Sequence, residues 1–169
     1  MNKIANLSVK IDKDVCYISV TGRANFDYGH NLRMRVKEDL EDIKYFVVDM
    51  KGCVFMDSTF MGMLTMLAKH ALVKHGQIKL INCCEHCHDL LDGLGVAEVF
   101  TFVKSEDPVN VPETAKDEDE APSNNKQLDM ARTVKFSHEE LINANPNTAP
   151  MFKPVVEGLE DDIKRLEKE

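Results

Sequence analysis

The chain has 169 residues with 43% hydrophobic content, enough to bury one core, so its length favours one domain with an extension. The formal net charge is −8: residues 1–103 carry 12 Lys/Arg and 13 Asp/Glu, whereas residues 104–169 carry 9 and 16. Neither part has the basic stripe that nucleic-acid binding needs. The sequence also contains no run of 18 apolar residues and no signal-peptide pattern, so we expect a cytoplasmic protein that does not insert into membranes.

Alternating apolar residues predict strands over residues 4–10 and 15–21, with Cys16, Ile18 and Val20 of the second strand facing the core. A helix with its basic residues on a solvated face is expected over residues 28–40. The predicted elements that follow are strand 44–50, ended by Lys51-Gly52, helix 58–75, ended by Gly76, strand 78–82, helix 85–93 and strand 98–103. This alternation favours an α/β fold in which helical crossovers pack on a sheet.

The segment that follows residue 103 is rich in Pro, Asp, Glu and Ser and lacks apolar periodicity, so residues 104–136 are predicted to be a linker. Residues 137–169 are predicted to form a helical hairpin, in which a capping box at Ser137 opens the first helix and Asn145-Pro146-Asn147 ends it. The second helix, over residues 154–169, should bury one stripe: Val155, Leu159, Ile163 and Leu166. A hairpin this small cannot bury its stripe alone, so we expect it to dock on its own domain, or on a second copy in a homodimer, rather than on a separate partner.

The most informative segment is VVDMKGCVFMDSTFMG, over residues 47–62, because it leads from a buried strand through a turn into a helix. Asp57, Ser58 and Thr59 are all good helix N-cap residues, and capping an unpaired backbone N–H explains most hydroxyls at such positions. A phosphate there would meet the positive end of the helix dipole and add about −1.5 to −2 charges. The turn therefore predicts either a simple cap or a modifiable switch.

The run FMDSTFMG closely resembles the FMDS-type signature of the STAS domain, which is shared by bacterial anti-sigma factor antagonists. The resemblance covers roughly residues 4–103, including Val20-Thr21-Gly22 and the run LLDGLGVAEVF over residues 90–100. It implies a mixed sheet with helices packed on it, and a protein partner that is both a serine kinase and the anti-sigma factor. It also implies that this kinase phosphorylates Ser58, with Thr59 as the fallback.

Two residues depart from the family pattern. Asn25 stands where many antagonists have an acidic residue near the phosphorylation site, and Phe60 stands where they usually have glycine. We expect the partner-binding surface to consist of Asn25, Asp57, Ser58, Thr59, Phe60 and Met61. A phosphate on Ser58 should weaken docking by its charge and bulk, so Ser58→Asp should reduce partner binding and Ser58→Ala should preserve it.

Two alternatives remain open. A STAS-type scaffold or assembly protein would work without phosphorylation, through self-association by the tail hairpin or docking into a larger complex. A metal- or redox-responsive protein would use Cys83, Cys84, His86, Cys87 and His88, since thiolate and imidazole suit zinc. No second Cys/His cluster is visible, so Cys84 is better explained as a helix cap and Cys87 as a small core residue.

The sequence does not favour enzymatic chemistry or a cofactor. It contains neither a Gly-rich phosphate-binding motif nor a nucleophile elbow, and His30 and His138 have no nucleophile nearby in the sequence. Five cysteines without an export signal also argue against a disulfide framework. We therefore expect a non-enzymatic binding module.

Overall fold

The computed structural model describes residues 6–106 and 126–169 and contains one five-stranded mixed sheet with the strand order β1-β2-β3-β4-β5. The strands are β1 (Asn6–Asp12), β2 (Val15–Ala24), β3 (Tyr45–Met56), β4 (Gln77–Ile81) and β5 (Thr101–Val103). β1 pairs antiparallel with β2, and β2 to β5 run parallel to one another. The predicted mixed sheet with helical crossovers is confirmed.

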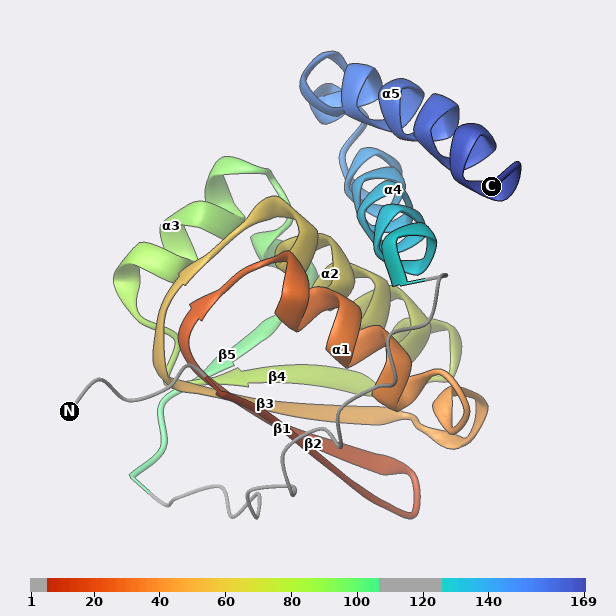
Figure 1. Ribbon diagram of the computed structural model, residues 1–169. Coiled ribbons are helices and arrows are strands. Elements are labelled where there is room, and N and C mark those ends of the chain that lie inside the picture. The colour runs from red at the N-terminus through yellow and green to blue at the C-terminus, as the bar shows by residue number, and fades with distance from the viewer. Residues whose placement is uncertain (1–5, 107–125) are drawn as a thin grey trace, which may run out of the picture.

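Helices connect the parallel strands. α1 (Phe26–Val36) and the short η1 (Leu40–Asp42) join β2 to β3, α2 (Ser58–Val73) joins β3 to β4, and α3 (Glu85–Gly93) with η2 (Ala97–Val99) joins β4 to β5. Helices α1 and α2 lie side by side on one face of the sheet (Figure 1). The bounds of α3 match the predicted helix, and none of the helices in the described residues is long and apolar enough to cross a membrane.

The core lies between the sheet and these helices. Cys16, Ile18 and Val20 of β2 are fully buried, as their alternation predicts, and they join the apolar face of α2 in one cluster. β3 continues through Lys51-Gly52, where the sequence predicted an end, up to Met56. Gly52 lies against Thr21 of β2, where a Cβ atom would come within 2.7 Å of the Thr21 Cγ2 atom. The glycine therefore allows close strand pairing at a register shift and does not stop the strand.

The end of α2 differs from the prediction in the role of its glycine. His75 adopts the left-handed conformation (φ 61°), and the N–H groups of His75 and Gly76 donate to the carbonyls of Leu72 and Ala71. This is the Schellman arrangement, with histidine at the left-handed position. Gly76 is needed for a different reason, because a Cβ atom there would lie 1.7 Å from the carbonyl oxygen of Lys44.

Two C-terminal helices complete the structure, and both differ in their bounds from the predicted hairpin. α4 spans Lys126–Ala144, so residues 126–136, predicted to be linker, form its first half, and Ser137 lies inside the helix rather than capping it. Asn145 ends α4 as predicted, and the short η3 (Pro146–Thr148) leads into α5 (Ala149–Glu167). Val156, not Val155, lies in the buried stripe of α5.

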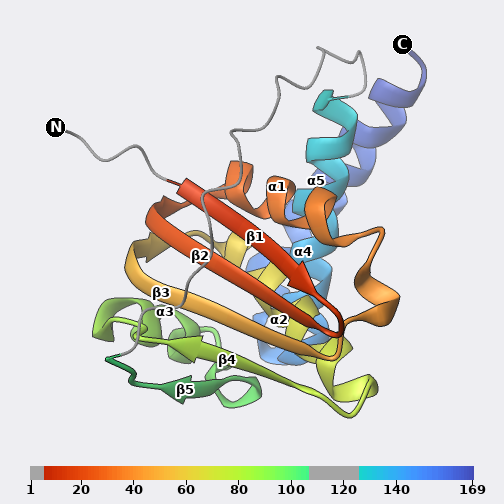
Figure 2. The same cartoon turned by 90° about the horizontal axis from the view of Figure 1, so that it is seen from below.

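The C-terminal helices dock on the STAS-like part of the same chain, one of the three arrangements considered above. α4 packs against α2 and α1, and α5 packs on the outer side of α4 (Figures 1 and 2). The molecule thus has three successive layers on one side of the sheet: α1 and α2, then α4, then α5. Helix α4 consequently covers part of the helix that begins at Ser58.

Candidate functional site

The corner between β3 and α2 is fixed by Asp57. Its backbone N–H donates to the carbonyl of Ala24 at 2.9 Å, which ties the corner to the end of β2. Its Oδ1 atom accepts the N–H of Phe60 at 2.9 Å, so Asp57 is the N-cap of α2. Because Asp57 fills the capping role, capping does not explain the hydroxyl of Ser58.

The Asp57 carboxyl is half-buried at this corner. Burial raises its pKa above the ordinary value of 3.8, and the hydrogen bond from the Phe60 N–H opposes that rise only in part. Burial therefore disfavours the charged form of Asp57, even though the carboxylate lies at the positive end of a helix.

Ser58 is the first residue of α2 and its side chain contacts a histidine from α4. The Ser58 Oγ atom lies 2.8 Å from the Nε2 atom of His138, and the Nδ1 atom of the same ring lies 2.6 Å from the carbonyl oxygen of Val134. A carbonyl can only accept, so Nδ1 carries the proton in the neutral ring and the Ser58 hydroxyl donates to Nε2. The ring also packs edge-on against Phe152 of α5, so both C-terminal helices position it.

The close approach of α4 depends on a glycine. A Cβ atom on Gly62, one turn after Ser58, would lie 2.3 Å from the carbonyl oxygen of Ser137, the neighbour of His138. With hydrogen alone at Gly62, the two helix backbones come near enough for His138 to reach Ser58. Gly62 is therefore the positioning residue for this contact.

Helix α4 makes further polar contacts with the domain, beside the apolar packing of Phe136, Leu141 and Ile142 on the core. Thr133 Oγ1 lies 3.0 Å from both the Nδ1 atom of His30 and the Nη1 atom of Arg33, so Arg33 is not part of a solvated face as the sequence suggested. Asn145, directly after α4, donates through its side chain to the carbonyl of Leu94 at 2.9 Å. Of the five buried residues of α4, only one is apolar: Thr133, Ser137, His138, Glu140 and Leu141.

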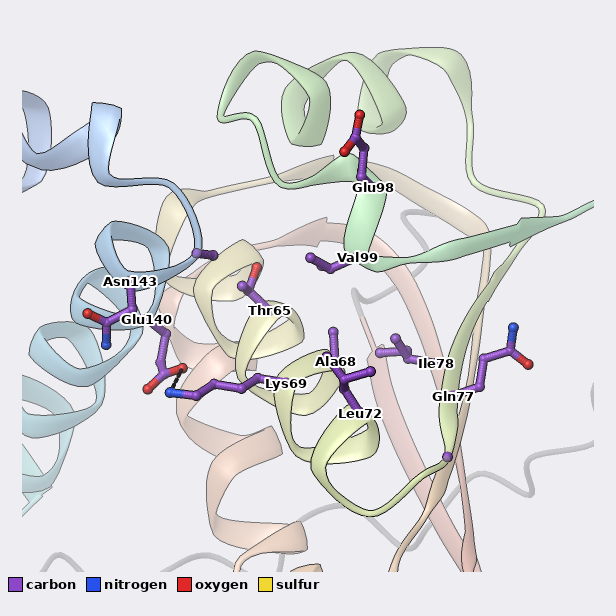
Figure 3. Close-up of a pocket in the computed structure, with 12 residues that line it drawn as sticks. Thr65, Ala68, Lys69, Leu72, Gln77, Ile78, Glu98, Val99, Glu140 and Asn143 are labelled. Atoms are coloured by element: carbon purple, nitrogen blue, oxygen red, sulfur yellow. Dashed lines mark ion pairs between the residues drawn. The ribbon is translucent and has the colours of Figure 1, made fainter.

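A pocket of about 560 Å³ opens beside this interface, between α2, α4, η2 and β4 (Figure 3). Glu140 of α4 and Lys69 of α2 face each other at its edge, with 3.6 Å between the Oε2 and Nζ atoms. Glu140 is buried, whereas the Lys69 side chain is 60% exposed, so the carboxylate is the more desolvated partner of the pair. The pocket is not lined by Ser58 or His138.

The predicted partner surface is only partly accessible. Thr59, Phe60 and Met61 are buried, so the expectation that Phe60 and Met61 form a docking surface is wrong for this state of the molecule. The Phe60 ring packs edge-on against Tyr28, because residue 60 begins the apolar stripe of α2. Asn25 caps α1 by accepting the N–H of Asp27 at 3.1 Å, which is a structural use for the amide.

Exposed apolar side chains occur at the start of α1 and near the carboxyl end of β3. Phe26 and Val54 are 45% and 58% exposed. The guanidinium carbon of Arg23 lies 4.2 Å from the centre of the Phe55 ring, on which His86 also stacks. Sequence reasoning did not single out Phe26 or Val54 as exposed apolar residues.

The cysteines at the start of α3 take the positions expected for them. Cys84 is the N-cap and its Sγ atom accepts the N–H of Cys87, and Cys87 is fully buried. Within residues 6–106 and 126–169, no group of three or more Cys, His, Asp or Glu side chains is arranged to hold a metal ion.

His138, Gly62 and Ser137 are the residues that sequence reasoning missed. Ser58 and His138 are 80 positions apart, and a single sequence carries no signal of such a pairing. The small or polar residues at positions 133 and 137, one helical turn apart, were the available hint of a closely packed helix face.

The STAS domain family model matches residues 6–109. Over 74 residues the chain is 30% identical to the STAS-domain containing protein PA14_20770 of Pseudomonas aeruginosa strain UCBPP-PA14, an alignment covering 44% of this chain and 73% of that protein.

The fold is similar to that of the anti-sigma factor antagonist SpoIIAA of Bacillus in its unphosphorylated form, with a TM-score of 0.54 and 11% identity over 60% of this chain and 90% of that chain. It is also similar to TM1081 of Thermotoga maritima, with a TM-score of 0.52 and 16% identity over 59% of this chain and 87% of that chain. At these identities the likeness concerns the fold alone. Because the STAS family model matches residues 6–109, more than half of the chain, the chain belongs to the STAS domain family.

Proposed function

We propose that this protein is a regulatory binding module whose state is set by phosphorylation of Ser58, and that its partner is a serine kinase of the anti-sigma factor type. The observation that carries the proposal is the Ser58 hydroxyl itself: it follows the capping Asp57, begins α2 and is held by His138 instead of serving as a cap. SpoIIAA, which shares the fold, has been solved in unphosphorylated and phosphorylated forms. The resemblance of FMDSTFMG to the FMDS-type signature supports the choice of Ser58 as the modified residue.

The start of α2 suits a phosphate chemically. Backbone N–H groups and the helix dipole favour negative charge at this end of a helix. Thr59, the fallback, is buried and therefore a poorer substrate for a kinase than the half-buried Ser58. A phosphate on Ser58 would repel the neighbouring Asp57 carboxylate and would raise the pKa of Asp57, which burial already raises, still further.

Helix α4 has a defined role in this proposal. A kinase must reach the Ser58 Oγ atom, which here lies 2.8 Å from His138, a gap too small for a phosphoryl group. Phosphorylation therefore requires α4 to leave, and the added bulk and charge then prevent its return. The polar residues that α4 buries fit such release, because interfaces within a chain that contain many polar groups resemble those of transient complexes.

The partner surface follows from the same geometry. With α4 docked, Phe26 at the start of α1 and Val54 near the end of β3 are exposed, so a partner can still reach them. Release of α4 adds Ser58 and the stripe of α2 that includes Gly62. We propose that the partner first contacts Phe26 and Val54, and that it competes with α4 for Ser58.

A hydrolytic role for the Ser58–His138 pair is less well supported. The pair has the distance of a nucleophile and its base, but His138 is oriented by a main-chain carbonyl, and the large pocket of the structure lies elsewhere. We therefore assign the pair to holding α4 rather than to catalysis.

The test is mass spectrometry of the protein isolated from the cells that make it, in several growth states. A phosphate on Ser58 in the tryptic peptide of residues 52–69 is expected, and its consistent absence would remove the switch. Gly62→Ala, which displaces α4, should raise Ser58 phosphorylation, whereas Gly158→Ala, whose added Cβ meets nothing within 4 Å, should not. Equal phosphorylation in the two variants would show that α4 does not control access.

Partner binding supplies the second test. Ser58→Asp should bind the kinase less well than Ser58→Ala, because the carboxylate imitates part of the phosphate charge. Phe26→Ser should weaken binding of every form, since it removes the apolar contact without touching Ser58. Equal affinity of the Ser58→Asp and Ser58→Ala forms would contradict the proposed switch.

A further inference from the structure

The first turn of α3 has the form of a C-x-x-C motif at a helix N-terminus. Cys84 caps the helix, and its Sγ atom accepts the N–H of Cys87 at 3.4 Å. The N–H of His88 donates to the Cys84 carbonyl at 2.9 Å, which closes the turn. In a helical turn, Cα atoms three residues apart lie about 5 Å from each other. That spacing falls within the range of about 4.4–6.8 Å that disulfides require.

The two thiols also point toward the same place. The Sγ atoms of Cys84 and Cys87 lie 3.6 Å and 3.7 Å from one acceptor, the carbonyl oxygen of Cys53 at the end of β3. The Cys84 and Cys87 thiols also interact directly through a side-chain hydrogen bond, so their sulfur atoms lie near each other. The reduced pair is thus held by weak S–H hydrogen bonds that a disulfide would replace.

The two cysteines differ in accessibility. Cys84 is half-buried, whereas Cys87 and Cys53 are buried. The hydrogen bond with the Cys53 thiol, together with burial, raises the pKa of the Cys87 thiol. Cys84 is the N-cap residue of α3. One accessible thiol followed by one buried thiol is the arrangement of redox-active C-x-x-C motifs.

We propose that Cys84 and Cys87 form a reversible disulfide by exchange with a low-molecular-weight disulfide such as glutathione disulfide. The Cys84 thiolate attacks one sulfur of that disulfide, forms a mixed disulfide and releases one thiolate. Cys87 then loses its proton and attacks the Cys84 sulfur, which closes the internal disulfide and releases the second small thiol. The two protein thiols give up two electrons, and the small disulfide takes them up as two thiols.

Neighbouring cysteines are poorer partners for Cys84. Cys83 is adjacent in sequence, and its thiol donates to the carbonyl of Cys84 instead of the Cys53 carbonyl that the Cys84 and Cys87 thiols share. Cys53 is buried on β3 and its thiol donates to the carbonyl of Phe55. Cys87 is the cysteine that the first turn of α3 brings to Cys84.

The experiment equilibrates the full-length reduced protein with glutathione and glutathione disulfide at a series of ratios, quenches with acid, alkylates the remaining thiols and maps the tryptic peptides. The peptide of residues 80–104 holds Cys83, Cys84 and Cys87, whereas Cys53 lies in the peptide of residues 52–69. The expected product is an unlinked 80–104 peptide that has lost about 2 Da, the mass of two hydrogen atoms, and returns to full mass in excess glutathione.

Variants identify the pair. Cys84→Ser keeps an N-cap acceptor and should abolish the loss of mass, whereas Cys83→Ser, the matched control, should leave it unchanged. Peptides 52–69 and 80–104 joined by a disulfide would overturn the assignment, because Cys53 would then be the partner. A glutathione adduct that never resolves, or thiols that stay reduced at every ratio, would overturn it as well.

Discussion

The two faces of helix α2 are buried in different ways. Toward the sheet, α2 buries an apolar stripe that belongs to the hydrophobic core: Phe60, Met63, Leu64 and Leu67. Toward α4 it presents Ser58, Gly62 and Lys69, which meet a hydroxyl-accepting ring, a backbone carbonyl and a carboxylate. The first face stabilises the domain through the hydrophobic effect. The second face holds α4, and its polar groups can hydrogen-bond to water instead when α4 leaves. The predictions below separate these two faces.

The largest effect is expected on the sheet side. Leu67 is fully buried, so Leu67→Ala should lower the free energy of unfolding by about 2–5 kcal/mol through lost burial and a residual cavity. Leu72→Ala is the control on the same helix, because Leu72 is 75% exposed and its replacement should change stability little. Urea denaturation of both variants measures the difference, and equal loss would contradict the division of α2 into two faces.

The next largest effect is expected from adding a methyl group at Gly62, where α2 and α4 approach closely. Gly62→Ala places a methyl group 2.3 Å from the Ser137 carbonyl oxygen, and such overpacking should weaken α4 docking by about 1–3 kcal/mol. Amide hydrogen exchange in α4 should then accelerate by about 5- to 150-fold, while β3 keeps its protection. Gly158→Ala in α5 is the matched control. Unchanged exchange in α4 would show that the helix does not depend on this close approach.

A smaller effect is expected from the single hydrogen bond. Ser58→Ala should weaken α4 docking by about 0.5–1.5 kcal/mol without lowering the stability of the sheet, because only the contact with His138 is lost. In a double-mutant cycle with His138→Ala, the two changes should be non-additive. Strict additivity would mean that the two side chains do not interact in solution.

The smallest effect concerns Asp57 and pH. A carboxyl whose folded pKa is raised above 3.8 binds protons more strongly when folded, so stability falls as pH rises from 3.8 through the folded value. Asp57→Asn keeps an N-cap acceptor without the charge, so it should be slightly stabilising at pH 7, and the gain should disappear below pH 3.8. Thermal unfolding at several pH values measures it, and a loss at pH 7 would contradict the sign.

Much of the fold follows from local pattern in the sequence. Alternation predicted the buried face of β2, capping residues predicted the start of α2, and the predicted bounds of α3 match the structure. The same periodicity that placed Phe60 in the core stripe already conflicted with its assignment to a docking surface, and the structure favours the core. The spacing of apolar residues was the stronger physical signal, because burial of a large ring outweighs its position in a turn.

The site could not be predicted completely, because its second half comes from the tail. Lys126 to Phe136 lacks a clean apolar stripe, and four of the five buried residues of α4 are polar or charged: Thr133, Ser137, His138 and Glu140. Such a face has no hydrophobic periodicity to detect, although its hydrogen bonds to the domain replace those to water. Helices that dock through polar contacts are therefore the elements that sequence reasoning misses.

The pocket beside the interface has a thermodynamic consequence. Both α2 and α4 contribute to its walls, α2 through Thr65 and Leu72 and α4 through Glu140 and Asn143 (Figure 3). The pocket therefore exists in this form only while α4 is docked. A small molecule that fills it binds the docked state alone, and at 100 times its Kd such a ligand adds about 2.7 kcal/mol to that state. A compound selected for thermal stabilisation would thus keep Ser58 covered without touching it.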